Sequence, residues 1–319
     1  MAEISKNIEK AKELLTQGQV VGIPTETVYG LAANALNPQA VARVFEVKKR
    51  PHFDPLIIHL YDASQLDDFC EHIPPLFYTL YQRFSPGPIT YILNKKSHIP
   101  DLVTAGQKTV GIRFPRHPLT RELLSQSRMA LAAPSANPFG YVSPTTAQHV
   151  QNQLGSEIPL ILDGGACLVG IESTIIDLSK EEPEILRLGG LALSDIEPVT
   201  GSLKVQSHSS SNPKAPGMLS AHYAPGKPLI IGNIEELLGN YAPNTVGIIS
   251  LFKSYPLVPE QHQKVLSPSQ NLREAAAQLF SALRELDTDG IEIILAEKMP
   301  EKGLGPAIND RLQRAAASN

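Results

Sequence analysis

The chain has 319 residues, more than one average domain, and its 42% hydrophobic and 19% charged residues are typical of a globular protein. Twenty-eight basic and 32 acidic residues give a net charge of -4, which argues against attraction of nucleic acid or an anionic membrane by overall charge. Two cysteines, Cys70 and Cys167, lack metal-type spacing and predict free thiols in a cytoplasmic chain rather than a disulfide scaffold.

The first predicted elements are a helix and a short buried strand. Apolar residues at helical spacing are Ile4, Ile8, Ala11 and Leu15, and Gly18 suits a helix C-cap. This charged segment lacks the apolar core of a signal peptide, and no stretch reaches the roughly 18 apolar residues of a membrane span. A strand over residues 20–23 then leads into the loop PTETVYGL, which contains Thr27.

The stretch KKRPHFDPLIIHL combines cations, prolines, an acid and a histidine in one turn. Asn37 followed by Pro38 predicts a helix start, and Pro51 ends that helix near Lys49, so Lys48 and Arg50 lie at its end. These cations either bind an anion or only complement the helix dipole. A strand over residues 56–60 follows and contains His59.

Further strands carry single polar residues. After a helical region over residues 66–84, TVGIRFP predicts a strand with Arg113 on one face, either solvated or available to a ligand. ALAAPSAN predicts a strand that breaks before Ser135. Ser143 is predicted to cap a helix that opens at Pro144, a position where a phosphate can also bind.

The remaining sequence predicts two more strands, a linker and a second domain. IESTIIDL and ILRLGG place Ser173 and Arg187 in short apolar strands. Residues 201–226 are serine-rich at first and predict a linker, whose His222 and Tyr223 either dock the domains or close on a ligand as a lid. Alternating strands and helices over residues 227–319 predict a Rossmann-like domain without a dinucleotide or phosphate-loop motif.

Cations and hydroxyls at strand ends favour a substrate with several negative charges. Arginine suits carboxylate and phosphate recognition, and lysine suits phosphate as a point charge. The sequence has no nucleophile elbow and no metal-spaced cluster of Cys and His. Positioning and charge stabilisation are sufficient for nucleotidyl or phosphoryl transfer.

Eight strings occur in order: PTETVYGL, KKRPHFDPLIIH, SPGPIT, TVGIRFP, APSAN, SPTT, IESTIIDL and ILRLGG. Together they resemble the YrdC-like threonylcarbamoyl-adenylate synthases over most of residues 10–190, and the remainder resembles the long, two-domain form of that family. The resemblance implies an α/β fold, with a twisted-sheet catalytic domain (residues 1–200), a linker or lid (201–226) and a small C-terminal domain (227–319). It also implies a positively charged cavity and the synthesis of threonylcarbamoyl-AMP and pyrophosphate from L-threonine, bicarbonate and ATP.

Carried over position by position, the resemblance implies the site residues. Lys48 and Arg50 are expected to be catalytic. Threonine is expected at Thr27, His59, Arg113, Ser135 and Ser173. ATP is expected at Arg50, Asp54, Thr109, Ala133, Ser143, Arg187 and Tyr223. Asp54 stands where the family usually has Asn, so it either pairs with Arg50 or helps to hold magnesium. Mg²⁺ is expected as the cofactor, held chiefly by the ATP phosphates, and no protein ligand for it is predicted.

The product is expected to pass to a complex that threonylcarbamoylates adenosine beside the anticodon of tRNA. Two other classes stay open. A carbamoyltransferase-type module of hydrogenase maturation shares the core fold, but it comes with zinc-finger and acylphosphatase-like parts that this sequence lacks. An RNA-binding or ribosome-maturation protein is disfavoured by the net charge of -4, and we expect no stable binding of nucleic acid and no membrane partner.

Overall fold

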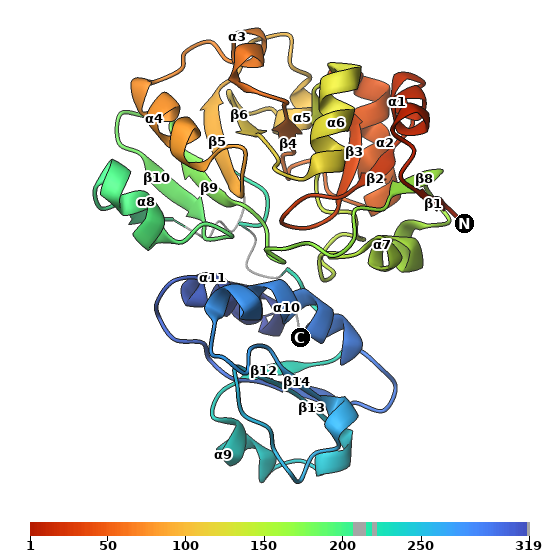
Figure 1. Ribbon diagram of the computed structural model, residues 1–319, viewed down its shortest axis with the longest axis vertical. Coiled ribbons are helices and arrows are strands. Elements are labelled where there is room, and N and C mark those ends of the chain that lie inside the picture. Colours follow the sequence, from red (N-terminus) through yellow and green to blue (C-terminus); the bar gives the residue numbers. More distant parts are fainter. Residues whose placement is uncertain (207–214, 219–221, 318–319) are drawn as a thin grey trace.

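The computed structural model describes residues 1–206, 215–218 and 222–317, which form a large and a small α/β body (Figure 1). The strands of the large sheet are β1 (Glu3–Ser5), β2 (Val21–Ile23), β3 (Gly30–Asn34), β4 (Ile57–His59), β5 (Ile89–Asn94), β6 (Thr109–Arg113), β7 (Leu131–Ala132), β8 (Leu160–Leu162), β9 (Thr174–Asp177), β10 (Glu184–Arg187) and β11 (Lys204–Val205). Their spatial order is β1-β8-β2-β3-β7-β4-β6-β5-β9-β10-β11, with parallel and antiparallel neighbours mixed.

Helices cover both faces of this sheet. They are α1 (Ile8–Thr16), α2 (Pro38–Lys48), α3 (Leu66–Phe69), α4 (Pro75–Phe84), α5 (Asp101–Thr104), α6 (Pro118–Ser127), α7 (Ala147–Leu154) and α8 (Leu193–Thr200). Side chains alternate along a strand, so Leu31 and Ala33 of β3 join the core that contains α2, while Ala32 joins the cluster that contains α1 and α6.

Helix α2 confirms the prediction made from cap chemistry. The Asn37 side chain accepts hydrogen bonds from the backbone N–H groups of Gln39 and Ala40, Pro38 is the first helical residue, and Lys49 ends the helix in left-handed geometry. The N-terminal prediction was partly wrong. Ile4 belongs to β1, which pairs in parallel with β8, so the helix begins only at Ile8.

The small body is a parallel sheet with helices on both sides. Its elements are β12 (Leu229–Ile231), α9 (Ile234–Leu238), β13 (Val246–Ser250), β14 (Gln263–Val265), α10 (Leu272–Glu285), β15 (Ile293–Ala296) and α11 (Gly305–Ala316). The spatial order is β12-β15-β13-β14, and all neighbours are parallel, as a Rossmann-like domain requires. Strand β14 was missed because QKV is short and largely polar.

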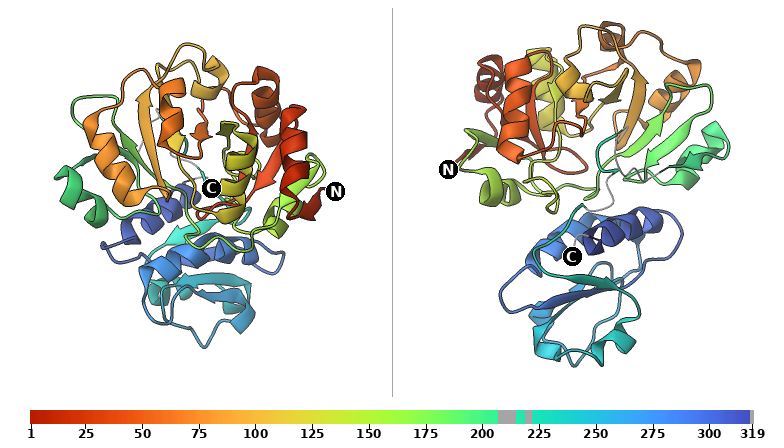
Figure 2. Two further views of the ribbon diagram at one scale, coloured as in Figure 1. Left: turned by 45° about the horizontal axis from the view of Figure 1, so that its top comes forward. Right: turned by 180° about the vertical axis from the view of Figure 1, so that it is seen from behind.

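Helices α10 and α11 lie between the small sheet and the large body (Figures 1 and 2). One apolar cluster joins Val28, Val142 and Ile171 to buried residues of both helices. Tyr141 Oη donates to Asp287 Oδ2 at 2.6 Å across the same boundary. The predicted α/β class with a second, smaller domain is therefore confirmed, and the two bodies are packed against each other.

The predicted linker, residues 201–226, is only partly described, since residues 207–214 and 219–221 lie outside the described residues. Its first part is not featureless, because β11 extends the large sheet in parallel with β10. The boundaries at residues 200 and 226 stay predictions. Among the described residues, no helix is both long and apolar enough to cross a lipid bilayer.

Candidate active site

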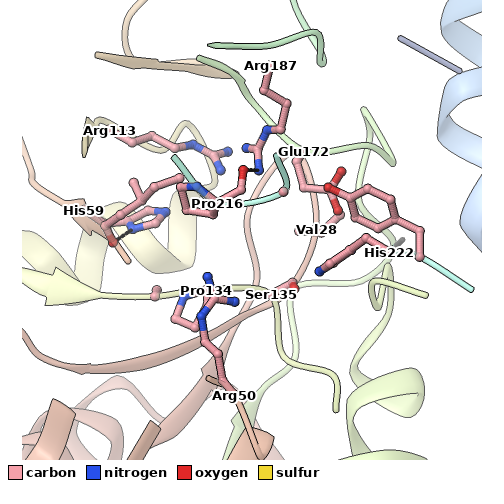
Figure 3. Close-up of a pocket in the computed structure, with 14 residues that line it drawn as sticks. Val28, Arg50, His59, Arg113, Pro134, Ser135, Glu172, Arg187, Pro216 and His222 are labelled. Atoms are coloured by element: carbon pink, nitrogen blue, oxygen red, sulfur yellow. Dashed lines mark hydrogen bonds between the residues drawn. The ribbon is translucent and has the colours of Figure 1, made fainter. Parts of the chain in front are cut away.

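A cavity lies at the carboxyl ends of β4 and β6, where His59 and Arg113 stand side by side in register (Figure 3). Seven of the residues predicted for the site line it: Arg50, His59, Arg113, Ala133, Ser135, Arg187 and Tyr223. The large body and the segment that follows it, through Pro216, Gly217, His222 and Tyr223, thus both contribute residues to one cavity.

Arg113 is buried at the end of β6, so the reading of a solvated strand arginine is wrong. Its Nη2 donates to Glu26 Oε1 at 2.7 Å and to Thr27 Oγ1 at 2.8 Å, while its Nε has no hydrogen-bond partner. Burial alone would raise the pKa of Glu26, but the charge of Arg113 and the hydrogen bonds from Arg113 and from the Arg116 N–H together outweigh burial and hold the pKa below its ordinary value. The Glu26 pair thus fixes the guanidinium and leaves one buried donor without a partner.

Arg187 joins β10 to the segment whose Pro216 and Gly217 line the cavity. Its Nε donates to the Ser173 carbonyl at 3.0 Å, its Nη2 to Ser173 Oγ at 3.1 Å and its Nη1 to the Pro216 carbonyl at 3.0 Å. Gly217 follows with φ of +75°, and a Cβ there would lie 2.6 Å from Tyr223 Oη. Only glycine therefore allows this segment to approach Tyr223 so closely.

The two cations of the predicted turn have different surroundings. Lys48 is fully buried, and its Nζ donates to the carbonyl oxygens of Ser135 and Asn137, so it supports the loop behind the cavity and does not line it. Arg50 lines the cavity, and its Nη2 lies 2.8 Å from Asp54 Oδ2. Burial raises the pKa of Asp54, and the nearby Arg50 opposes that rise.

Ser143 does not cap a helix, which corrects the prediction. Helix α7 begins later, at Ala147, and Thr146 Oγ1 is the cap, accepting from the His149 N–H at 3.2 Å. Ser143 Oγ instead donates to Glu172 Oε1 at 2.6 Å. The Ser143 hydroxyl thus connects the segment before α7 with Glu172 in the cavity wall.

Five of the six remaining predicted residues lie behind the residues that line the cavity. Lys48, Thr27, Ser143, Ser173 and Asp54 do not line the cavity, but each contacts a residue that does. Thr109 begins β6 at the end opposite Arg113 and pairs with Asn94, so its predicted contact with ATP stays a prediction.

Sequence reasoning missed Glu26 and seven lining residues: Val28, Ile57, Pro134, Glu172, Pro216, Gly217 and His222. His222 was considered for docking or a lid but was not assigned to the site. Glu172 carried a usable signal, because a carboxylate at the start of the apolar strand IESTIIDL must be paired if it is buried.

Acid should destabilise the protein through two buried histidines. Burial lowers the pKa of His59 and of His222 to about 3 from 6.5. The unfolded chain binds these protons first, so stability is complete above pH 6.5 and is lost as the pH falls toward 3. Between pH 7.5 and pH 5, each histidine should cost about 2 kcal/mol of unfolding free energy, measured by urea titration. In His59→Gln the loss should shrink by about that amount, and an unchanged pH slope would contradict the assignment.

Comparison with known proteins places this geometry in a family. A family model described as telomere recombination (Sua5, YciO, YrdC) matches residues 13–189, more than half of the chain. The chain belongs to the Sua5–YciO–YrdC family. A second model, described as the threonylcarbamoyl-AMP synthase C-terminal domain, matches residues 191–317, as in the two-domain form.

Relatives in this family match almost the whole chain. Threonylcarbamoyl-AMP synthase of Pyrococcus abyssi is 40% identical over 97% of this chain and 94% of its own length, and that of Bacillus subtilis is 40% identical over 98% and 95%. The crystal structure of P. abyssi Sua5 complexed with L-threonine aligns with a TM-score of 0.91 and 40% identity, over 98% of this chain and 94% of that one.

The family resemblance inferred from the eight motifs is therefore confirmed. No group of three or more His, Cys, Asp or Glu side chains suited to a metal ion occurs within the described ranges. The one carboxylate in the cavity wall, Glu172, is paired with Arg311 at 2.9 Å.

Proposed function

We infer that this chain is a threonylcarbamoyl-AMP synthase, a nucleotidyltransferase that uses L-threonine, bicarbonate and ATP. The observation that carries this inference is 40% identity with curated synthases over nearly the full chain, through both domains. A carbamoyltransferase-type module and an RNA-binding protein are less well supported, because the C-terminal family match covers the rest of the chain.

We propose that threonine binds at Thr27, His59, Arg113, Ser135 and Ser173. The support is geometric: Arg113 keeps a buried Nε without a partner, and a carboxylate is the ligand that a fixed guanidinium prefers. His59 and Ser135 line the same cavity, while Thr27 and Ser173 brace its arginines. His59 would be neutral at pH 7, because burial lowers its pKa to about 3.

The ATP phosphates would lie near Arg50 and Arg187, which line the cavity with Arg113. Tyr223 and Pro216 cover it, so the described part of the linker segment would limit access of water to the intermediates. We also propose that ATP is bound by four further residues: Asp54, Thr109, Ala133 and Ser143. Magnesium bound to the phosphates would neutralise part of their charge.

In the proposed reaction, the threonine amine combines with bicarbonate to give a carbamate and water. A carbamate oxygen then bonds to the α-phosphorus while the bond from that phosphorus to pyrophosphate breaks. Lys48, by holding the carbonyl oxygens of Ser135 and Asn137, would keep the loop beside the reacting groups in place. The chain thus mainly aligns anions that repel each other in water.

The product would serve threonylcarbamoylation of adenosine beside the anticodon of tRNA, through a separate transfer complex. A cytoplasmic location is consistent with the two cysteines, which are both buried and free.

Pyrophosphate release tests the function. The complete mixture should release pyrophosphate, and omission of threonine, bicarbonate or ATP in turn should abolish release. Threonylcarbamoyl-AMP should appear by mass spectrometry in the complete mixture alone. Release of pyrophosphate without threonine, or its absence in the complete mixture, would refute the proposal.

Asp54→Asn should lower the rate by less than about tenfold, or about 1.4 kcal/mol. Arg50 also donates to the carbonyl oxygens of Asp54 and Pro55, at 3.2 and 2.9 Å, and asparagine retains these contacts. The magnesium concentration for half-maximal rate should not change. A large rise in that concentration would instead make Asp54 a metal-linked residue.

A further inference from the structure

Helix α11 of the C-terminal domain carries two arginines that are almost completely enclosed. Arg311 is 0% exposed and Arg314 is 1% exposed. Surface arginines of a helix usually keep their charged ends in water, and burial of such a charge is costly unless it is paired. These two residues therefore need partners, and the partners show what the helix contributes.

Arg311 reaches across the domain boundary to the wall of the cavity. Its Nε donates to Glu172 Oε2 at 2.9 Å, and its Nη1 donates to Asp310 Oδ2 at 2.7 Å. Arg314 Nε also donates to Asp310 Oδ2, at 3.0 Å. Asp310 therefore holds both arginines, while Glu172 receives a cation from the other domain.

Arg311 also lies against Tyr223, another residue that lines the cavity. Its guanidinium carbon is 5.2 Å from the centre of the Tyr223 ring, and that ring also stacks on Phe280 of α10, with the ring centres 5.5 Å apart. A cation over an aromatic ring adds attraction that is stronger when water is excluded. The second domain thus holds two lining residues, Glu172 and Tyr223.

Glu172 is the one carboxylate among the lining residues, in a site that should bind anions. The groups that face it are Arg311, Arg187, Ser143, His222 and Tyr223. Burial alone would raise the pKa of Glu172, but the charges of Arg311 and Arg187, together with the hydrogen bonds from Ser143 and Arg311, outweigh burial and hold the pKa below its ordinary value. Without Arg311, Arg187 would be left to neutralise Glu172 as well as to bind phosphate.

We propose that Arg311 is a positioning residue for ATP binding: it neutralises and orients Glu172, so that Arg187 remains available to the triphosphate. The C-terminal domain then completes the active site without contacting a substrate through Arg311. This proposal rests on the inferred synthase function. It assigns a role in the reaction to a domain that carries no nucleotide motif.

Arg311→Gln should raise the KM for ATP about tenfold or more, because an unpaired buried carboxylate is left beside the phosphate site. The threonine KM should change much less. The double variant Arg311→Gln/Glu172→Gln should have an ATP KM close to the wild-type value, since no unpaired charge remains. Arg311→Lys should also recover part of the loss, because lysine keeps the charge.

Tyr141→Phe is the matched control. It removes the interdomain hydrogen bond to Asp287, outside the cavity wall, and should leave the ATP KM unchanged. Urea titration of each variant gives the folded fraction by which rates are corrected. If Arg311→Gln does not fold, the double variant Arg311→Gln/Glu172→Gln decides: an ATP KM near the wild-type value supports the proposal, and an ATP KM about tenfold higher overturns it.

The outcomes separate the two proposals. If wild-type protein releases no pyrophosphate, the inferred function fails. If wild-type protein is active but folded Arg311→Gln keeps its ATP KM, or Glu172→Gln does not restore it, the role of Arg311 is refuted while the function stands.

Discussion

Arg113→Ala should weaken threonine binding by about 2 to 4 kcal/mol, or roughly 30- to 1,000-fold, and affect ATP much less. The reason is the position of Arg113 at the end of β6, where Glu26 fixes one side of the guanidinium and the Nε remains without a partner. Titration calorimetry with each substrate measures the two losses separately. Equal weakening of both substrates would contradict the threonine assignment.

Arg113→Ala should also lower the stability of the protein, and this effect must be separated from the loss of threonine binding. Arg113→Ala also leaves Glu26 buried without its cation, which destabilises the chain. Adding Glu26→Gln should recover stability in urea titration but should not recover threonine affinity. Arg121→Ala is the matched control, because Arg121 binds the Tyr61 carbonyl at 3.1 Å, lies outside the cavity wall and should leave threonine affinity unchanged.

Gly170→Ala should destabilise the protein by about 2 to 5 kcal/mol and lower its rate. Gly170 has φ of +76°, and a Cβ there would lie 2.4 Å from the Ala277 Cα in α10. Since that contact is with backbone, the domains must separate or the chain before Glu172 must shift. Urea titration and the pyrophosphate assay measure the two effects.

Gly106→Ala separates backbone strain from the clash. Gly106 has the same φ of +76°, but no atom lies within 4 Å of a Cβ placed there. Gly106→Ala should therefore lower the free energy of unfolding only by the backbone strain, about 1 to 2 kcal/mol, and leave the rate per folded molecule unchanged. If the two variants lose equal stability, the close approach of Gly170 to α10 has no energetic role.

Local chemistry predicted much of the fold. Asn37 and Pro38 define a helix start within three residues, and the structure has that start. The same reasoning failed at Ser143, because SPTT offers more than one capping residue and the structure uses Thr146. Ile4 failed for another reason: its pairing with β8, about 155 residues away, leaves no local trace.

The sequence predicted the basic residues of the site better than its acidic residues. Arginines in apolar strands are conspicuous, and Arg113 and Arg187 do line the cavity. Glu26 and Glu172 were missed because a site for anions does not suggest carboxylates, although buried arginines need them. Arg311 could not be connected with Glu172 from sequence, since the two are 139 residues apart and in different domains.

The apolar cluster between the domains has a consequence for how the molecule melts. Val28, Val142 and Ile171 share buried surface with α10 and α11, so neither domain keeps its apolar residues covered when the other unfolds. Heating should therefore give a single calorimetric transition, with calorimetric and van't Hoff enthalpies in agreement, although the chain contains two sheets. We therefore expect the two domains to unfold as one cooperative unit.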